Sequence, residues 1–113
     1  MTCETWQVAV VPFPFTDRAT TRRRPALVLS ARAFNRRGHS VLAMITSASH
    51  QPWAGDTPIG DLKTAGLKAP SLVRLKLFTL DNRFIARRIG TLGSPDQMLV
   101  ATKLRAFLPV LAD

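Results

Sequence analysis

The hydrophobic residues of this chain fall in short runs, separated by polar segments that contain glycine and proline. Residues 8–11 (VAVV) and 26–29 (ALVL) are two such runs, too short for a confident helix, and each is predicted to form a strand. Pro12 and Pro14 cannot donate hydrogen bonds to a sheet, which places Phe13 and Phe15 at a strand end or a bulge. The polar residues 16–21 are predicted to form the loop between the two strands.

Further strands are indicated downstream. Residues 40–46 are almost continuously apolar, a pattern typical of a strand that is covered on both faces. Residues 71–80 alternate between apolar and polar side chains, and residues 84–92 are expected to pair with them as a hairpin through a polar turn at residues 81–83. Residues 51–63 contain several proline, glycine and aspartate residues, which predicts a loop with at most a short strand at residues 56–59.

The last part of the chain shows helical spacing. Ser94 is expected to be the N-cap, with Pro95 at the first helical position and Gln97 completing a capping box. Apolar residues then recur along one helix face, which is expected to pack on the core: Val100, Leu104, Phe107, Leu108 and Leu111. Pro109 is expected to end the helix. These elements predict one mainly β domain spanning residues 1–113, a small bent sheet or barrel with a C-terminal helix.

The composition is strongly basic. The chain has 16 Lys and Arg against 7 Asp and Glu, a formal net charge of +9 and an isoelectric point near 11.5. A surplus of this size serves solubility, but it also favours polyanionic partners through counterion release. The charge therefore indicates a nucleic acid, or an acidic protein that shields this surface, as the partner.

Several classes are disfavoured by what the chain lacks. Cys3 is the only cysteine, which excludes an intrachain disulfide and a four-cysteine metal site. No apolar run approaches the roughly 20 residues of a membrane-spanning helix, and the N-terminus MTCETWQ has no basic segment typical of a secretory signal. His39, His50 and the scattered acids show no metal-ligand spacing. We therefore expect a cytoplasmic protein that contacts no membrane and needs no metal or other cofactor.

Four groups of short motifs follow one another along the chain. They are PFPFTD with RRPALVLS (within residues 12–30), MITS (44–47), GLKAPS (66–71) leading to Leu80-Asp81, and IGTL (89–92). In this order they resemble the MazF/PemK family of toxin endoribonucleases, and the resemblance extends over residues 6–108. One position departs from it, because the family usually has Gly-Asp before the first strand and this chain has Trp6-Gln7.

The resemblance implies an SH3-like barrel that dimerises and that acts as the toxin of a toxin–antitoxin pair, neutralised by an acidic antitoxin. It also implies that the Arg before Pro and the Thr after the third strand carry catalysis, and these are Arg24 and Thr46 here. The residue types suit cleavage of single-stranded RNA without metal. The RNA's own 2′-hydroxyl attacks the adjacent phosphorus, an arginine pairs with two phosphate oxygens, and a hydroxyl adds one more hydrogen bond.

Further residues are candidates for RNA contact through charge, a hydroxyl group or base stacking: Arg22, Arg23, Ser47, Arg74, Lys76 and Trp53. Arg74 and Lys76 are expected to share one face of the strand at residues 71–80, from which both follow a phosphate backbone. Trp53 lies in a Pro-Gly loop, where an unpaired base can stack on it. Phe13 and Phe15 also offer rings for stacking, although they fit a core or an interface better.

The group that transfers protons is left open. Arginine is a poor general base because its pKa exceeds about 12, whereas His39 and His50 could serve as an acid–base pair. His50 follows Thr46 by four residues and could reach the same sheet edge as an auxiliary group. Two other functions also stay open: a nucleic-acid-binding module that does not cut, and a toxin of the same fold that binds a protein target such as a topoisomerase.

Overall fold

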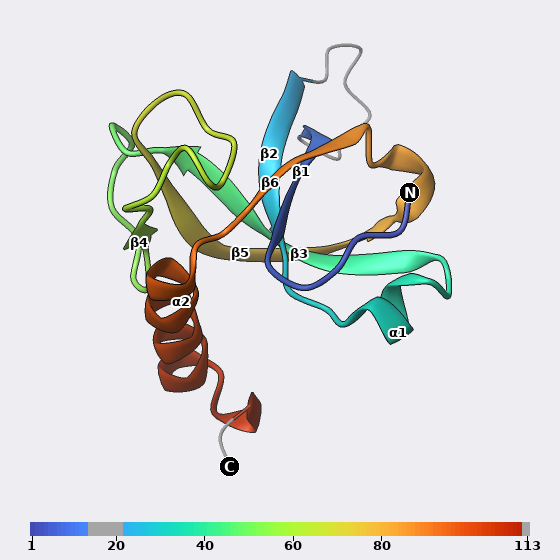
Figure 1. The fold of residues 1–113 in the computed structure, drawn as a ribbon. Coiled ribbons are helices and arrows are strands. Elements are labelled where there is room, and N and C mark those ends of the chain that lie inside the picture. Colours follow the sequence, from blue (N-terminus) through green and yellow to red (C-terminus); the bar gives the residue numbers. More distant parts are fainter. Residues whose placement is uncertain (14–21, 112–113) are drawn as a thin grey trace.

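The computed structural model describes residues 1–13 and 22–111, and its centre is a curled six-stranded antiparallel sheet (Figure 1). The strand order is β4-β5-β3-β2-β1-β6. The strands are β1 (Gln7–Phe13), β2 (Arg22–Val28), β3 (His39–Ser47), β4 (Thr57–Pro58), β5 (Ser71–Asp81) and β6 (Arg87–Thr91). The helices are α1 (Arg32–Asn35), the 3₁₀ turn η1 (Asn82–Phe84), α2 (Ser94–Phe107) and the 3₁₀ turn η2 (Pro109–Leu111). The predicted mainly β fold with a C-terminal helix is confirmed. Pro14, Phe15 and the predicted loop lie outside the described residues.

The central strands are apolar on both faces because the curled sheet has a core on each side. Successive side chains of a strand point to opposite faces. Val8 and Leu27 therefore enter one core, together with Val100 of α2. Their neighbours Ala9 and Ala26 enter the second core. The same division holds for β3, which confirms the prediction that residues 40–46 form a strand covered on both sides.

The predicted hairpin between residues 71–80 and 84–92 is wrong. Strand β6 pairs with β1, while β5 pairs with β3 and β4. After β5 the chain turns through η1, and Ile85 is then buried in the second core. Ala86 N donates to Val10 O over 2.8 Å, which begins the pairing with β1. The buried Ile85 thus lies where the chain passes from β5 to the opposite edge of the sheet.

Helix α2 begins differently from the prediction. Gly93 is the N-cap, no side chain caps the helix, and Ser94 is already helical, so the predicted Ser94 cap is wrong. Two other contacts hold this end. The Gln97 side chain donates to Leu92 O over 2.7 Å. The buried Asp96 carboxylate accepts the amides of Gly60 and Asp61 over 2.9 and 3.0 Å.

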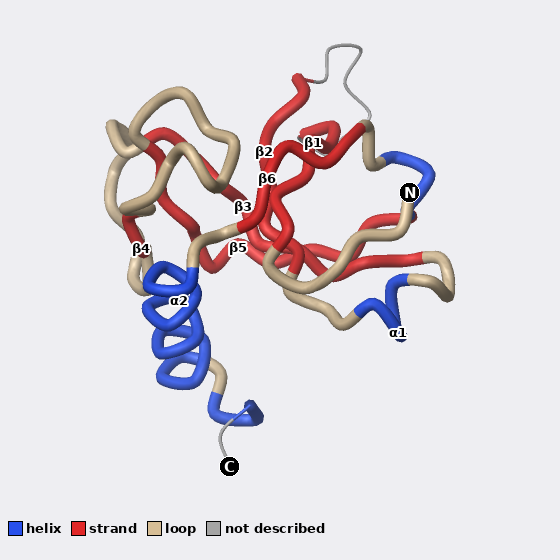
Figure 2. The backbone as a smooth tube through the Cα atoms, viewed as in Figure 1, coloured by secondary structure: helices blue, strands red, loops and turns tan. Residues whose placement is uncertain are grey.

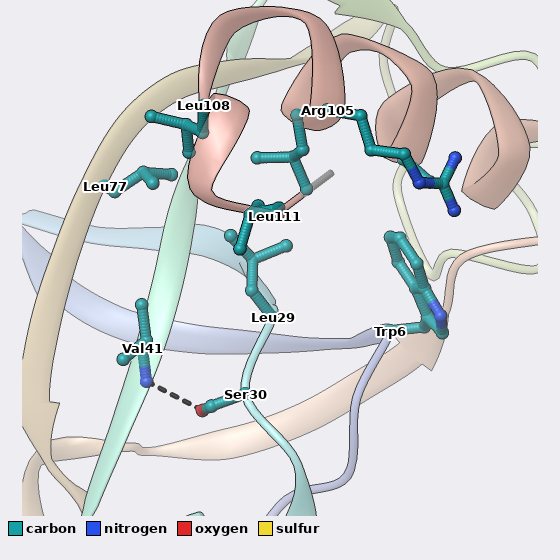
Figure 3. Close-up of a pocket in the computed structure, with 10 residues that line it drawn as sticks. Trp6, Leu29, Ser30, Val41, Leu77, Arg105, Leu108 and Leu111 are labelled. Carbon is teal, nitrogen blue, oxygen red and sulfur yellow. Dashed lines mark hydrogen bonds between the residues drawn. The ribbon is translucent and has the colours of Figure 1, made fainter. Parts of the chain in front are cut away.

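The far end of α2 leaves the sheet, as Figure 2 shows. Val100 and Leu104 are buried as predicted, but Phe107 and Leu111 are both 52% exposed, so the expected apolar face packs over only part of its length. An open pocket of about 430 Å³ lies between the helix and the sheet. Leu29, Leu77, Leu108 and Leu111 line it, with Trp6 and Arg105 at one side (Figure 3). Among the described residues, no helix has the length and apolar character to cross a membrane.

Trp6 takes an unusual backbone conformation just before β1. Its φ is +74°, in the left-handed region that glycine adopts easily, and a non-glycine residue there costs roughly 1–2 kcal/mol. Trp6 N donates to Val28 O and Leu92 N donates to Trp6 O, both over 2.8 Å, so two neighbouring segments hold this backbone in place. The chain therefore makes a glycine-like turn at the position where it departs from the usual Gly-Asp, and the Trp6 ring lines the α2 pocket.

Candidate functional site

Arg24 and Thr46 lie on neighbouring strands, where β2 and β3 separate. The β2–β3 pairing runs from Val28↔Leu42 to Ala26↔Met44, and continuing its register by two residues on each strand brings Arg24 level with Thr46. The pairing ends just before Pro25, which has no N–H to donate. Beyond this point the strands run apart (Figure 1), and within the described chain no hydrogen bond joins Arg24 to Thr46. The two residues flank the separation point, one on each strand.

The arginines at the start of β2 keep their positive charge unneutralised by any described acid. Arg22 and Arg23 are exposed and Arg24 is half-buried. The described carboxylates are all engaged elsewhere: Glu4 with Arg32, Asp56 with Arg74, Asp81 with Arg83, Asp61 with Thr64, and Asp96 with backbone amides. Arg22 and Arg24 share one face of β2 and Arg23 lies on the other, which gives this end of the strand a strong positive charge that favours an anion.

Thr46 and His50 are in direct contact. Thr46 is only 4% exposed. Its Oγ1 lies 2.6 Å from Nδ1 of His50, which is an exposed residue. A turn brings them together, because His50 N donates to Ser47 O over 3.2 Å. Ser47 is exposed, and its hydroxyl lies 2.9 Å from the Ser49 hydroxyl. The sequence predicted only that His50 could reach the sheet edge at Thr46. In the structure His50 is the hydrogen-bond partner of the Thr46 hydroxyl.

Arg74 and Lys76 both approach the Trp53 ring, as expected for residues on one strand face, but Arg74 is buried rather than exposed. The Arg74 side chain is 9% exposed and pairs with the Asp56 carboxylate, Nε to Oδ1 at 3.1 Å and Nη2 to Oδ2 at 3.0 Å. The register of β5 shifts at this point, because Ala43 pairs with Leu77 and the next residue, Met44, pairs with Arg74. Arg74 is therefore committed to an internal ion pair.

The same ion pair organises the segment after the Thr46 turn. Nη2 of Arg74 donates to Gln51 O over 2.7 Å, and the Asp56 carboxylate accepts the Trp53 amide over 2.8 Å. Burial by itself raises the pKa of the Asp56 carboxyl, but hydrogen bonds from Arg74 and Trp53, with the Arg74 charge, hold this pKa below its usual value. The carboxylate is thus ionised at neutral pH and anchors the loop at several points.

An exposed aromatic surface forms above this pair. The Trp53 ring is 47% exposed and covers the Arg74 guanidinium at 4.8 Å. Lys76 Nζ lies 5.9 Å from the Trp53 ring and 5.2 Å from the Phe13 ring. We call Trp53, Lys76 and Phe13 the Trp53 platform. Three candidates from the sequence, Trp53, Arg74 and Lys76, are thus brought together, with Arg74 beneath the ring rather than beside it.

Asp56 is the residue of this region that the sequence did not single out. It lies 18 residues from Arg74, and no local spacing links the two. The Thr46–His50 contact had a weak signal, a separation of four residues across the end of a strand. Within residues 1–13 and 22–111, no three His, Cys, Asp or Glu side chains gather in a group that could hold a metal ion.

The curled sheet with its C-terminal helix is the architecture of the MazF toxins. The chain superimposes on MazF from a MazE–MazF crystal structure from Deinococcus radiodurans with a TM-score of 0.77 and 21% identity, over 96% of this chain and 98% of that chain. For the Mycobacterium tuberculosis toxin MazF-mt6 the TM-score is 0.70 and the identity 20%, over 88% and 93% of the two chains. For a mycobacterial endoribonuclease in complex with its cognate antitoxin, the TM-score is 0.72 and the identity 16%, over 96% of this chain and 94% of that chain. These likenesses establish the fold.

The sequence defines the family. Residues 4–108 match the family model described as the PemK-like, MazF-like toxin of type II toxin–antitoxin systems. The chain therefore belongs to this toxin family, as the order of its motifs predicts. A comparison with curated proteins returned no significant match.

Proposed function

We propose that this protein is a metal-independent endoribonuclease toxin that cleaves single-stranded RNA. The observation that carries the proposal is the placement of Arg24 and Thr46 on either side of the point where β2 and β3 separate, next to the unneutralised Arg22 and Arg23. Membership of the MazF-like toxin family supports the same reading.

The reaction uses the 2′-hydroxyl of the RNA as its nucleophile. The 2′-oxygen bonds to the adjacent phosphorus while the bond from phosphorus to the 5′-oxygen breaks. The 2′-hydroxyl loses its proton to a base and the departing 5′-oxygen gains one, which leaves a 2′,3′-cyclic phosphate and a 5′-hydroxyl. Arg24 would pair with two phosphoryl oxygens as negative charge develops, and Thr46 would donate one further hydrogen bond.

The surrounding residues would bind the strand. Arg22, Arg23 and the Ser47 hydroxyl would contact phosphates on either side of the cut, and Lys76 would contact the backbone near the Trp53 platform. The half-exposed Trp53 ring would stack with an unpaired base, which favours a single strand over a duplex. Arg74 has a supporting role in this proposal, because its ion pair with Asp56 holds the Trp53 loop.

An acidic antitoxin and a second copy of the chain are the proposed protein partners. Structures of the same fold are complexes of MazF with MazE and of an endoribonuclease with its cognate antitoxin. The net charge of +9 suits an acidic segment that covers the RNA-binding surface. A second copy would cover the exposed apolar side chains of the α2 pocket, such as Leu77 and Leu111.

The direct test is to incubate the purified protein with a mixed single-stranded RNA, and with DNA of the same sequence, in excess EDTA. We expect RNA fragments that end in a 2′,3′-cyclic phosphate and begin with a 5′-hydroxyl, and we expect intact DNA because it lacks the attacking hydroxyl. Activity that EDTA removes and magnesium restores would contradict the mechanism. Tight RNA binding without cleavage would favour a non-cutting module, and intact, unbound RNA would favour a protein target.

A further inference from the structure

The contact between Thr46 and His50 extends the proposed site by one residue. Thr46 is almost completely buried, so its hydroxyl has few directions in which to find a partner, and the partner it has is Nδ1 of His50 at 2.6 Å. His50 itself is an exposed residue. Nothing in the family resemblance assigned a role to this histidine.

The turn that carries His50 is held on both sides. On the β3 side, His50 N donates to Ser47 O over 3.2 Å and Ala48 N donates to Pro70 O over 3.1 Å. On the other side, Gln51 O accepts a hydrogen bond from the buried guanidinium of Arg74 over 2.7 Å. The backbone on each side of His50 is thus anchored, which keeps its ring beside Thr46.

The chemistry of a hydroxyl decides what His50 can contribute. A threonine hydroxyl has one proton to donate and two lone pairs that accept. If the proton points at the imidazole, Thr46 offers only lone pairs to an anionic phosphoryl oxygen. If Nδ1 carries a proton and donates it to Oγ1, the hydroxyl proton is free for the phosphate. Only the second arrangement stabilises the charge that develops on the phosphoryl oxygens.

We propose that His50 is a positioning residue that acts through Thr46: its Nδ1–H donates to Oγ1 and leaves the hydroxyl proton directed toward the scissile phosphate. This inference rests on the proposed function, because it assigns His50 to the RNA-cleaving site. We do not assign to His50 the removal of the 2′-hydroxyl proton or the protonation of the 5′-oxygen. Its effect is limited to what the Thr46 hydrogen bond contributes.

Asparagine and glutamine variants separate this role from general acid–base catalysis. The side-chain amide of asparagine places an N–H near the position of Nδ1, whereas that of glutamine reaches toward Nε2. His50→Asn should therefore keep the hydrogen bond to Thr46 without a titrating ring. In single-turnover cleavage of a short RNA, we expect His50→Ala and His50→Gln to be about 3- to 10-fold slower, the contribution of one neutral hydrogen bond. His50→Asn should stay within about 2-fold of wild type.

A double-mutant cycle tests whether His50 acts through Thr46. Adding His50→Ala to Thr46→Ala should slow cleavage no further, because the hydroxyl that His50 orients is already gone. His39 is the matched control, an exposed histidine at the opposite end of β3, and His39→Ala should cleave at the wild-type rate. Circular dichroism checks that each variant is folded. If His50→Asn is as slow as His50→Ala, or if the two losses multiply in the double variant, the positioning role is refuted.

A spectroscopic measurement keeps this inference separate from the proposed function. Nitrogen-15 NMR of the imidazole at pH 8, without RNA, should show His50 protonated at Nδ1 in the wild type and a loss of that preference in Thr46→Val. An unprotonated Nδ1 in the wild type overturns the inference even if RNA is cleaved. If the protein shows the Nδ1–H signal but cleaves no RNA, the hydrogen bond from His50 to Thr46 is supported and the proposed function is refuted.

Discussion

Replacement of Asp56 by alanine should remove a large part of this protein's stability. The Arg74 and Asp56 side chains are 9% and 11% exposed, and Asp56 accepts two hydrogen bonds from Arg74 and one from the Trp53 amide. Alanine would leave the guanidinium buried without a counter-charge, with Gln51 O as a hydrogen-bond partner and the Trp53 ring over it. Removing one member of a buried ion pair costs about 3–5 kcal/mol. Because small domains have only about 5–15 kcal/mol in total, Asp56→Ala should be folded but far less stable than wild type.

The assay is urea denaturation at pH 7, followed by tryptophan fluorescence and circular dichroism. Glu4→Ala is the matched control, because the Glu4–Arg32 pair is 3.8 Å long with side chains 57% and 63% exposed, and an exposed pair contributes at most about 1 kcal/mol. Adding Arg74→Met to Asp56→Ala should recover part of the loss, since apolar replacement of a whole buried pair is often close to neutral. If Asp56→Ala and Glu4→Ala are equally stable, the pair does not behave as buried and the reasoning is wrong.

The same pair predicts a dependence on pH. The pKa of Asp56 is lower in the folded protein than its usual value, so the ionised carboxylate stabilises the fold. This contribution is fully present above the unfolded pKa of about 3.9, and it is lost as the pH falls through the lower, folded value. The difference in free energy of unfolding between wild type and Asp56→Ala should therefore be constant near neutral pH and shrink below about pH 4. A difference that grows as the pH falls would contradict this assignment.

Two further predictions concern the reaction and the fold. Arg24→Ala should slow single-turnover RNA cleavage on the order of 100- to 1000-fold with an unchanged circular dichroism spectrum, as expected for loss of one preorganised donor. Thr46→Ala should slow cleavage less, because a neutral hydroxyl makes a weaker hydrogen bond. A fully active Arg24→Ala protein would show that Arg24 is not part of the site. Gly66→Ala should lower the free energy of unfolding in urea by at least about 2 kcal/mol, because Gly66 has a φ of +77° and an added Cβ would lie 2.0 Å from Ile89 O. Gly38→Ala shares the backbone strain of a positive φ, at +122°, but its added Cβ meets no atom within 4 Å. It should therefore cost less than Gly66→Ala, and equal losses would show that the clash at Gly66 is relieved.

The local pattern of the sequence determined which segments form strands. Side chains of a strand alternate between its faces, so the continuous apolar run at residues 40–46 had to be buried on both sides, and β3 is. The motif order placed Arg24 before Pro25 and Thr46 at the end of β3. The β2–β3 pairing ends at Ala26↔Met44, and Arg24 and Thr46 lie two residues beyond it, one on each strand. These features depend on neighbours within a few residues, which is why periodicity and motif spacing could predict them.

Contacts between distant segments decided the rest. Strand β6 pairs with β1 after the buried Ile85, and no alternation within residues 84–92 reveals which edge of the sheet will accept them. Arg74 occupies a polar position in an alternating strand pattern, yet it is buried in an ion pair with an acid 18 residues away. An isolated strand pattern specifies only that a side chain lies on one face. Whether a charge there meets water, RNA or a buried carboxylate is fixed by the loop that folds over it, and that loop is positioned only when the whole sheet has formed.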